Sequence, residues 1–508
     1  MSKAAKIAHL ASSTDFPKAS LKPDVFVFDT YEFNYRTLTA YFHYVGKNGL
    51  SFCETIHFAK PSQKIPENDP NFTVLLDSAL KLAFYLVGVS YYKTAPTKTV
   101  KTFGLDEAQA KFFSTVYQDG LSQFAFTNHL AKKDLATFTA DSPERLKILK
   151  SFRAQALASA NSTNSEVNHS KASNSTDFPV LNNFTDDALI LQSGGKDSLL
   201  NATLCKTPHT FFYLSANGKY PELLNTLNAP LQVAIRHLDR NNLSQAQGLN
   251  GHIPVTYIVM SLALIQAILN RQKTVFTSIG QEGNEPHFII RENGKADSDI
   301  TRHEPGDFPV NHQWSKTAEA EKLFRDYVHT YISPELDIYS PLRQFTELKI
   351  AKLFAENCWE KYGHQFSSCN VINYTQNADN HELRWCGNCS KCANSYLLFA
   401  PFVPRAELDS IFDNKSLFEN PKLINDFQGL LHVGNHTKPF ECVGETDELR
   451  YAYHHRRPEY PKLPFDVPEA DFDLDRNSVK SLTKLFTDEN NRGVKSPTKP
   501  FTENNNAE

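Results

Sequence analysis

The sequence shows no excess of charge of either sign. Its 508 residues include 53 Lys and Arg against 57 Asp and Glu, so the formal net charge is −4. A protein that binds the phosphate backbone of a nucleic acid normally carries an excess of basic residues on one surface. The overall balance offers no support for a nucleic-acid partner, and we expect none.

The sequence also shows no pattern typical of a secretory leader and no long hydrophobic run. Residues 1–20 contain lysine but no continuous apolar core, which predicts that there is no signal peptide. The longest apolar helix, near Phe72–Tyr92, carries Asp77 and Lys81, and we expect no run long enough to span a bilayer. These absences predict a cytoplasmic protein without a membrane partner.

Cysteine is scarce, with eight residues, whereas aromatic residues are plentiful, with 37 Phe and 20 Tyr. The aromatic content is typical of a globular chain rather than a disordered one. In a reducing cytoplasm, clustered cysteines indicate metal binding or catalysis more than disulfides. A chain of this length is expected to form two or three domains.

Apolar alternation predicts β structure over residues 24–60, and helical periodicity predicts helices over 72–92 and within 105–150. The stretch that follows is rich in Ser, Asn and Thr, which is typical of a linker. We predict an N-terminal α+β accessory domain at 1–154, a linker at 155–183, an α/β domain at 184–410, a smaller mixed C-terminal segment at 411–480 and a disordered tail at 481–508.

The central stretch of the chain is Ala188–Leu200. It begins as an apolar run typical of a buried parallel strand, passes through a Ser-Gly-Gly turn, and opens a helix at Lys196. Such a turn can direct backbone N–H groups and a helix N-terminus at one anion, and its glycines allow phosphate oxygens to approach the backbone. Lys196 adds positive charge, while Asp197 could hold Mg²⁺ or cap the helix.

Strands and helices alternate after this turn. We predict further strands at 209–215, 233–237 and 274–279 and helices at 255–270, 318–329 and 345–356. The alternation predicts an α/β fold with a doubly wound, mostly parallel sheet that binds its ligand at the carboxyl ends of the strands. Glu282, Asn284 and Glu285 follow the strand at 274–279 and are therefore candidate site residues, with a solvated loop as the alternative.

Four cysteines lie within 24 residues of one another: Cys369, Cys386, Cys389 and Cys392. This spacing suits a tetrahedral Zn²⁺ site, and an iron–sulfur cluster could use the same ligands. The alternatives are free structural thiols or a catalytic cysteine. The isolated Cys53, Cys205 and Cys358 are expected to be structural.

The hexapeptide Ser-Gly-Gly-Lys-Asp-Ser resembles the PP-loop of the ATP pyrophosphatase superfamily, since its spacing does not match the Walker loop. Most of the chain is also similar to the MurL-like PP-loop epimerases that act on the terminal L-glutamate of UDP-N-acetylmuramoyl-L-alanyl-L-glutamate in peptidoglycan synthesis. The strings that carry this second resemblance are Leu82–Phe84, Gly88–Lys93, Ser193–Ser198, His312–Lys316, Ser340–Arg343, Glu347-Leu348, Trp385–Cys392, Leu397–Phe402 and Lys438–Gly444.

The resemblance implies an adenine nucleotide alpha hydrolase-like domain that binds ATP and Mg²⁺ at 184–410. The substrate carboxylate would be adenylated with release of pyrophosphate, and the α-proton would then become acidic enough for a side-chain base. The residues expected to bind the nucleotide are Ser193, Gly194, Gly195, Lys196, Asp197 and Ser198. The catalytic candidates are Lys196, Asp197, Glu285, His312, Lys316 and Arg343, with Glu285 or His312 as the base.

Two other readings stay open at this point. Another PP-loop adenylating enzyme, such as a 7-cyano-7-deazaguanine synthase or a tRNA-modifying enzyme, would share the turn and, in the first case, a four-cysteine zinc site. A non-catalytic nucleotide-binding regulator could keep the fold, although it would not need every pyrophosphate contact. Nothing in the sequence indicates the oligomeric state.

Overall fold

The computed structural model describes residues 25–148, 151, 178–292, 294–297, 300, 304, 306–376, 382–475 and 482–486. Most of the predicted linker and the predicted tail beyond residue 486 lie outside these residues. Within the tail, Leu482–Phe486 form a short 3₁₀ helix, and the ring of Phe486 packs on that of Phe276 at 5.5 Å between centroids.

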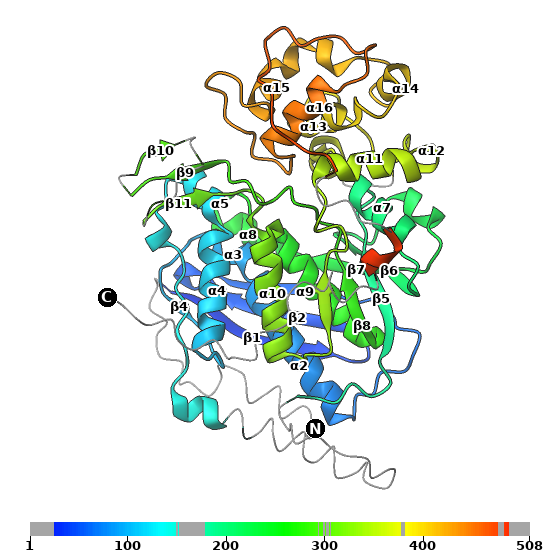
Figure 1. Ribbon diagram of the computed structural model, residues 1–508. Helices are drawn as coiled ribbons and strands as arrows, with labels where there is room; N and C mark the ends of the chain where they lie inside the picture. The colour runs from blue at the N-terminus through cyan, green and yellow to red at the C-terminus, as the bar shows by residue number, and fades with distance from the viewer. Residues whose placement is uncertain are drawn as a thin grey trace, which may run out of the picture.

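One nine-stranded sheet runs through the chain, in the order β12-β8-β5-β6-β7-β3-β2-β1-β4 (Figure 1). The five strands from β12 to β7 are parallel, β7-β3-β2-β1 pair antiparallel, and β1 pairs parallel with β4. The strands are β1 (Phe26–Asn34), β2 (Thr39–Val45), β3 (Ser51–His57), β4 (Val100–Lys101), β5 (Thr185–Leu191), β6 (His209–Ser215), β7 (Leu231–His237), β8 (Gln272–Phe276) and β12 (Asp337–Tyr339).

The parallel strands are buried on both faces. Leu189 on β5 belongs to the core on one side of the sheet, while Ala188 and Ile190 belong to the core on the other side, and all three are fully buried. A strand covered on both faces is expected to read as a continuous apolar run, as this one does. The prediction of an α/β fold with a large, mostly parallel sheet is confirmed.

The N-terminal strands continue this sheet, because β3 pairs with β7 through Thr55–His57. The boundary predicted near residue 184 therefore does not separate two sheets. A second, three-stranded antiparallel sheet lies beside α5 in Figure 1. Its strands are β9 (Phe288–Ile290), β10 (Ala296–Asp297) and β11 (Phe308–Val310).

Helices cover both faces of the large sheet. One core contains α2 (Pro70–Val87), α4 (Glu107–Asp119), α9 (Val255–Asn270) and α10 (Ala318–Tyr331), and the opposite core contains α7 (Lys196–Leu204), α11 (Glu347–Asn357) and α13 (Ser390–Phe399). The predicted helix over 72–92 is divided at Gly88 into α2 and α3 (Val89–Tyr92). A Cβ atom at Gly88 would lie 2.6 Å from Phe28 Cε1, so only glycine lets this helix approach β1 so closely.

The helix pair over Pro70–Tyr92 corrects one expectation. It is long and apolar enough to cross a membrane, with a mean hydropathy of 1.7, but 78% of its most apolar window is buried inside the protein. The two charged side chains that argued against a membrane span have partners within the protein. Asp77 accepts a hydrogen bond from Tyr31, and Lys81 donates to the Gly104 carbonyl. Length, composition and burial together are typical of a core helix.

The helices predicted within 105–150 are confirmed as α4, the short α5 (Ser122–Thr127) and, beyond a loop, a helical segment over residues 143–148. One other expectation changes. The C-terminal segment predicted as mixed contains helices and no strand in the described residues 405–475. These helices are α14 (Arg405–Ser410), α15 (Ile424–Leu430) and α16 (Thr446–His454), and with α13 they form the upper lobe in Figure 1.

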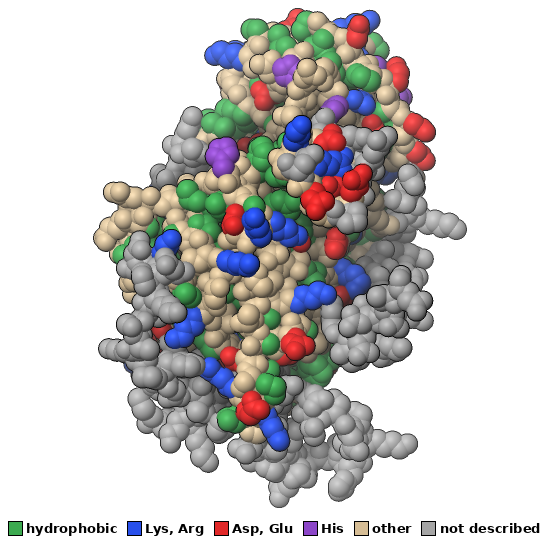
Figure 2. Space-filling model, turned by 90° about the vertical axis from the view of Figure 1, so that its left-hand side faces the viewer, with side chains coloured by type: hydrophobic (Ala, Val, Ile, Leu, Met, Phe, Trp, Pro, Cys, Tyr) green, Lys and Arg blue, Asp and Glu red, His purple; other side chains and the backbone are tan. Residues whose placement is uncertain are grey.

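Side chains of both charges are interspersed on the face shown in Figure 2. Two further α-helices are α8 (Arg240–Ala246), which follows β7, and α12 (Trp359–Tyr362), which follows α11. The helices predicted at 255–270, 318–329 and 345–356 are confirmed within two residues at each end as α9, α10 and α11.

A buried ion pair joins the antiparallel and parallel parts of the sheet. Arg236 on β7 donates to Glu54 on β3 at 2.5 Å and to Ser90 on α3 at 2.8 Å, and the side chain of Glu54 is fully buried. Glu54→Ala would leave the Arg236 guanidinium without its buried carboxylate. We expect the free energy of unfolding, measured by chemical denaturation, to fall by about 3–5 kcal/mol.

Asp119→Ala provides the matched control, because Asp119 pairs with Lys132 where both side chains are substantially exposed. We expect this change to cost less than about 1 kcal/mol. Equal losses in the two variants would contradict the role assigned to the buried pair.

Candidate active site

The turn between β5 and α7 lies at the carboxyl edge of the parallel strands. Gly194 has a φ of +79°, a left-handed conformation that favours glycine. Gly195 N–H donates to Ser193 Oγ at 3.3 Å, and Ser198 Oγ donates to the Gly195 carbonyl at 3.1 Å. With Ser193 exposed and the N-terminus of α7 adjacent, the turn can present hydroxyl and N–H donors to an anion.

β5 lies between β6 and β8 in the sheet. The strands that follow β5 in the sequence lie first on one side of it, as β6 and β7, and then on the other side, as β8. This position is a topological switch point, where the loops after neighbouring strands diverge and leave a crevice. Asn201 on α7 donates to the Thr277 carbonyl at 2.9 Å and so connects the helix that follows the turn to the loop after β8.

Lys196 is buried, and its ammonium lies 2.9 Å from Asp197 Oδ1 and 3.0 Å from Glu347 Oε1. Burial alone would lower the pKa of Lys196, but the two carboxylates outweigh it and hold the pKa above its ordinary value. The ammonium therefore stays charged. It joins the turn to the first residue of α11.

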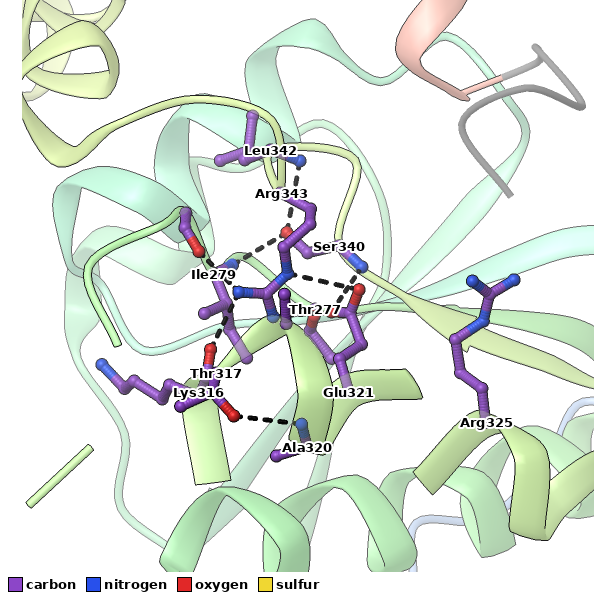
Figure 3. Close-up of polar contacts among 12 residues, drawn as sticks. Thr277, Ile279, Lys316, Thr317, Ala320, Glu321, Arg325, Ser340, Leu342 and Arg343 are labelled. Carbon is purple, nitrogen blue, oxygen red and sulfur yellow. Dashed lines mark hydrogen bonds and ion pairs between the residues drawn. The ribbon is translucent and has the colours of Figure 1, made fainter. Parts of the chain in front are cut away.

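Arg343 serves as a brace (Figure 3). Its guanidinium donates to the Gly280 carbonyl at 2.6 Å and the Lys316 carbonyl at 2.8 Å, and it pairs with Glu321 on α10 at 2.9 Å. These contacts hold the loop after β8 against the 3₁₀ turn that carries Lys316. The Arg343 side chain therefore holds the backbone of the site in place.

Glu285 and Asn284 are also engaged within the protein. Glu285 pairs with the buried Lys438 at 2.6 Å and accepts a hydrogen bond from the N–H of Thr446 at the start of α16. Asn284 Oδ1 accepts from the N–H of Ala318 at the start of α10. Both side chains link the loop after β8 to the first turn of a helix.

Lys316 points away from the Arg343 brace in Figure 3. Its ammonium lies 3.6 Å from Glu282 Oε1. Burial lowers the pKa of Lys316, but the negative charges around it raise the pKa above its ordinary value. Those charges come from four separate parts of the chain, namely Cys442, Glu282, Asp197 and Glu347.

Two buried carboxylates in this region keep an oxygen without a hydrogen-bond partner among the described residues. These atoms are Glu282 Oε2 and Glu347 Oε2, on side chains that are 6% and 7% exposed. A buried polar atom without a partner is costly, and native proteins retain few of them. The unpaired oxygens are therefore suited to a cation or a hydrogen-bond donor supplied by a ligand.

His312 lies next to Cys442. Its Nδ1 lies 2.7 Å from Gln123 Oε1 and its ring centroid lies 3.9 Å from that of His252, and the imidazole is one of the groups that lower the pKa of Cys442. Burial lowers the pKa of His252 to about 3, and the neighbouring positive groups add to this effect. His252 is therefore neutral at physiological pH.

A cavity of about 440 Å³ opens between the loop after β8 and α16. Its acidic lining includes Glu445, Asp447 and Asp473, whereas Lys349 is a basic residue in it. Burial raises the pKa of Glu445 to about 7, and the nearby Glu285 contributes. This lining suits a cation better than a phosphate group.

The structure thus brings four sequence-predicted residues to one site: Lys196, Asp197, His312 and Lys316. Arg343 and Glu285 border the same loop but bind other protein groups. Sequence reasoning missed Glu347, Cys442 and Lys391, although all three stand inside the strings quoted for the family resemblance. These three residues could have been found from the sequence, because a charged residue or thiol without an assigned role in such a string is a candidate for contact with a ligand.

The four clustered cysteines converge as predicted. Their sulfurs all lie within 4.8 Å of one another, with Cys369–Cys389 and Cys386–Cys392 at 3.7 Å and Cys389–Cys392 at 3.5 Å. A tetrahedral Zn²⁺ with Zn–S bonds of about 2.3 Å would hold its sulfurs about 3.8 Å apart. The cysteines are free thiols, and their arrangement fits such an ion.

This cysteine cluster lies close to the Ser-Gly-Gly turn. A Cβ atom at Gly195 would lie 3.3 Å from the hydroxyl of Ser368, the residue before Cys369. Cys389 is the N-cap of α13, so the cluster also positions Lys391 in the first turn of that helix. Closing the cluster therefore holds two segments of the chain against the site.

Together, these features define an α/β protein with a polar site at the carboxyl edge of its parallel strands. Comparison with known families identifies the chain more closely. The MurL N-terminal domain matches residues 18–341 and the MurL C-terminal domain matches residues 365–462. The protein belongs to the MurL family.

Three curated relatives carry the name UDP-N-acetyl-alpha-D-muramoyl-L-alanyl-L-glutamate epimerase. The protein from Xanthomonas oryzae pv. oryzae is 30% identical over 80% of both chains. The one from a Micromonospora species is 31% identical over 84% of this chain and 85% of its own. The one from Salinispora tropica is 30% identical over 84% and 83%. The first family domain spans the sequence on both sides of residue 184, as the continuous sheet does.

The arrangement of the four cysteines predicts that the protein binds a metal, and the metal content can be measured. We expect protein purified under reducing conditions to contain about one Zn²⁺ per chain by plasma mass spectrometry, and Cys386→Ser to lose it because three thiolates bind zinc more weakly than four. Cys53→Ser, at an isolated cysteine, is the control and should retain the metal.

Iron with sulfide in place of zinc would assign the cluster to iron–sulfur chemistry. Metal-free protein that folds normally would contradict a metal site altogether.

Proposed function

We propose that this protein is an ATP- and Mg²⁺-dependent epimerase. It would convert the terminal L-glutamate of UDP-N-acetylmuramoyl-L-alanyl-L-glutamate to D-glutamate through a carboxyl-adenylate, releasing AMP and pyrophosphate, in peptidoglycan precursor synthesis. Family membership and the names of the three relatives support the substrate and the type of reaction.

The Ser193–Ser198 turn, at the switch point of the sheet, is the observation that supports the use of ATP in the proposed reaction. Its exposed serine, its glycine backbone and the N-terminus of α7 offer several donors to one anion. Pyrophosphate is the ligand that this set of donors would bind. Lys196 supplies a permanent positive charge beneath the turn.

Asp197, Glu282 and Glu347 are the residues that would hold Mg²⁺. Hard cations prefer carboxylate oxygens, and two of these three side chains retain a buried oxygen without a partner. When bound, Mg²⁺ would neutralise charge on the phosphates. Two lysines hold these carboxylates in place, because Lys196 pairs with Asp197 and Glu347 and Lys316 pairs with Glu282.

The proposed reaction begins when a carboxylate oxygen of the glutamyl residue attacks the α-phosphorus of ATP and pyrophosphate leaves. Adenylation removes the negative charge that would oppose carbanion formation at Cα, so a base can take the α-proton. A proton then returns to the opposite face, and water hydrolyses the D-glutamyl adenylate to the free carboxylate and AMP.

The test follows AMP and pyrophosphate from ATP and Mg²⁺, with and without UDP-N-acetylmuramoyl-L-alanyl-L-glutamate, and the chirality of the recovered glutamate. We expect AMP to depend on the dipeptide and D-glutamate to accumulate. AMP with another acid and none with this one would reassign the substrate, as for a deazaguanine or tRNA-modifying enzyme. No AMP with any acceptor would favour a nucleotide-binding regulator.

Ser193→Ala tests the turn. Losing one donor to the leaving pyrophosphate should lower kcat/KM for ATP by about 10²-fold, measured as dipeptide-dependent pyrophosphate release. Ser244→Ala on α8, whose hydroxyl donates to a carbonyl of its own helix, is the control and should match the unmodified protein. An unchanged kcat/KM in Ser193→Ala would remove the turn from the reaction.

A further inference from the structure

Cys442 lies outside the four-cysteine cluster, in the loop before α16. Gln313 Nε2 donates to the Val443 carbonyl at 3.0 Å, and Gly444 N–H donates to Asn394 Oδ1 at 3.0 Å. Both amide side chains are almost completely buried. The backbone after Cys442 is therefore held rigidly, while Cys442 as a residue is partly exposed.

The loop is anchored before the thiol as well. Lys438 pairs with Glu285, and the ring of His287 lies 2.9 Å from the Pro439 carbonyl through Nε2. A segment fixed on both sides of one partly exposed cysteine is the arrangement expected of a residue that must meet a ligand in one orientation.

Three basic side chains lie close enough to Cys442 to influence its pKa. Lys316 comes from the 3₁₀ turn before α10, Lys391 from the first turn of α13, and His312 from the segment just before that 3₁₀ turn. Burial on its own would raise the pKa of Cys442, but these groups outweigh it and lower the pKa to about 6. At neutral pH the sulfur is a thiolate, which is both a base and a nucleophile.

A second observation indicates that a ligand enters next to this thiolate. Glu347 Oε2, which has no partner among the described residues, lies 3.1 Å from the position a Cβ atom of Gly444 would take. Glu282, with its own unpaired oxygen, lies next to Lys316. Gln313 Nε2 donates to the carbonyls of both Glu282, at 2.9 Å, and Val443, at 3.0 Å, so the loop that carries Cys442 lies directly beside the loop that carries a proposed Mg²⁺ ligand.

We propose that the Cys442 thiolate is the base that removes the α-proton of the adenylated glutamyl residue, on one of its two faces. This assignment rests on the proposed function. The sulfur takes the proton and becomes a thiol, the C–H electron pair forms a double bond between Cα and the carboxyl carbon, and the carbonyl electrons move to the oxygen as an enolate. Lys316, the charge that most lowers the pKa of Cys442, supplies positive charge near this step.

The remaining protons also balance. When the enolate collapses, Cα accepts a proton on the opposite face from water, and the Cys442 thiol returns its own proton to solvent through His312. No oxidant or reductant is needed. The thiol contributes only to proton transfer, so adenylation of the carboxylate does not require it.

This separation of steps gives the experiment. Adenylation is measured as dipeptide-dependent exchange of labelled pyrophosphate into ATP, and proton abstraction as deuterium entering the glutamate Cα from D₂O. We expect Cys442→Ser to keep pyrophosphate exchange within about 3-fold and to lose deuterium incorporation and D-glutamate by about 10²–10⁴-fold, the usual contribution of a general base. Cys53→Ser is the control and should retain both.

Three other outcomes would contradict either the role of Cys442 or the proposed function on which it rests. Deuterium incorporation at the unmodified rate in Cys442→Ser would overturn the proposal. Loss of both reactions, in a variant that retains its metal content, would make Cys442 a structural residue and also overturn it. Absence of dipeptide-dependent pyrophosphate exchange in the unmodified protein would instead refute the proposed function, and the assignment of Cys442 would fall with it.

The state of the thiol gives a readout independent of turnover. Alkylation of Cys442 by iodoacetamide, followed by mass spectrometry of its peptide, should report half-maximal reactivity near pH 6. Deuterium incorporation should decline about tenfold per pH unit below that value, because the thiolate becomes protonated.

His312→Gln removes an imidazole that lowers the pKa of Cys442 and should move both profiles to higher pH, which a merely structural role would not do. Profiles that stay at the same pH in this variant would exclude His312 as the group that positions and stabilises the thiolate.

Discussion

The buried Lys196 ammonium is the constraint on which the arrangement of the site depends. A buried cation is tolerated only with partners, and removing one partner of a buried pair typically costs about 3–5 kcal/mol. Lys196 finds its partners in Asp197 and Glu347, at the first residues of α7 and α11. The requirement to pair this charge therefore fixes the two helix starts relative to each other.

The same constraint extends into the C-terminal helices. Glu448 on α16 accepts a hydrogen bond from the N–H of Leu348 at 2.7 Å, and burial together with Glu347 raises the pKa of Glu448 to about 8. A protonated Glu448 can lie beside Glu347 without repulsion. Lys196, Glu347 and Glu448 thus form a continuous polar connection from the Ser-Gly-Gly turn to the loop that carries Cys442.

The sequence predicted the elements whose residues interact locally. The helix at Val255–Asn270 was predicted with its observed bounds, because a long apolar period is decided by neighbours three and four residues apart. The pairing of β3 with β7 was not predicted, because it joins residues about 180 positions apart and no local pattern encodes it. The C-terminal helices were missed as a class because they are short, with six to nine residues each.

By itself the sequence determined the Ser-Gly-Gly turn and the four-cysteine cluster, since each depends on residue types at short, fixed spacings. Only the tertiary structure decided how the isolated charges are used. Arg343 and Lys316 are equivalent candidates in the sequence, yet one binds backbone carbonyls and the other faces Glu282 and Cys442. The physical reason is that the role of a buried charge is set by the partners within a few ångströms of it, and those partners come from distant parts of the chain.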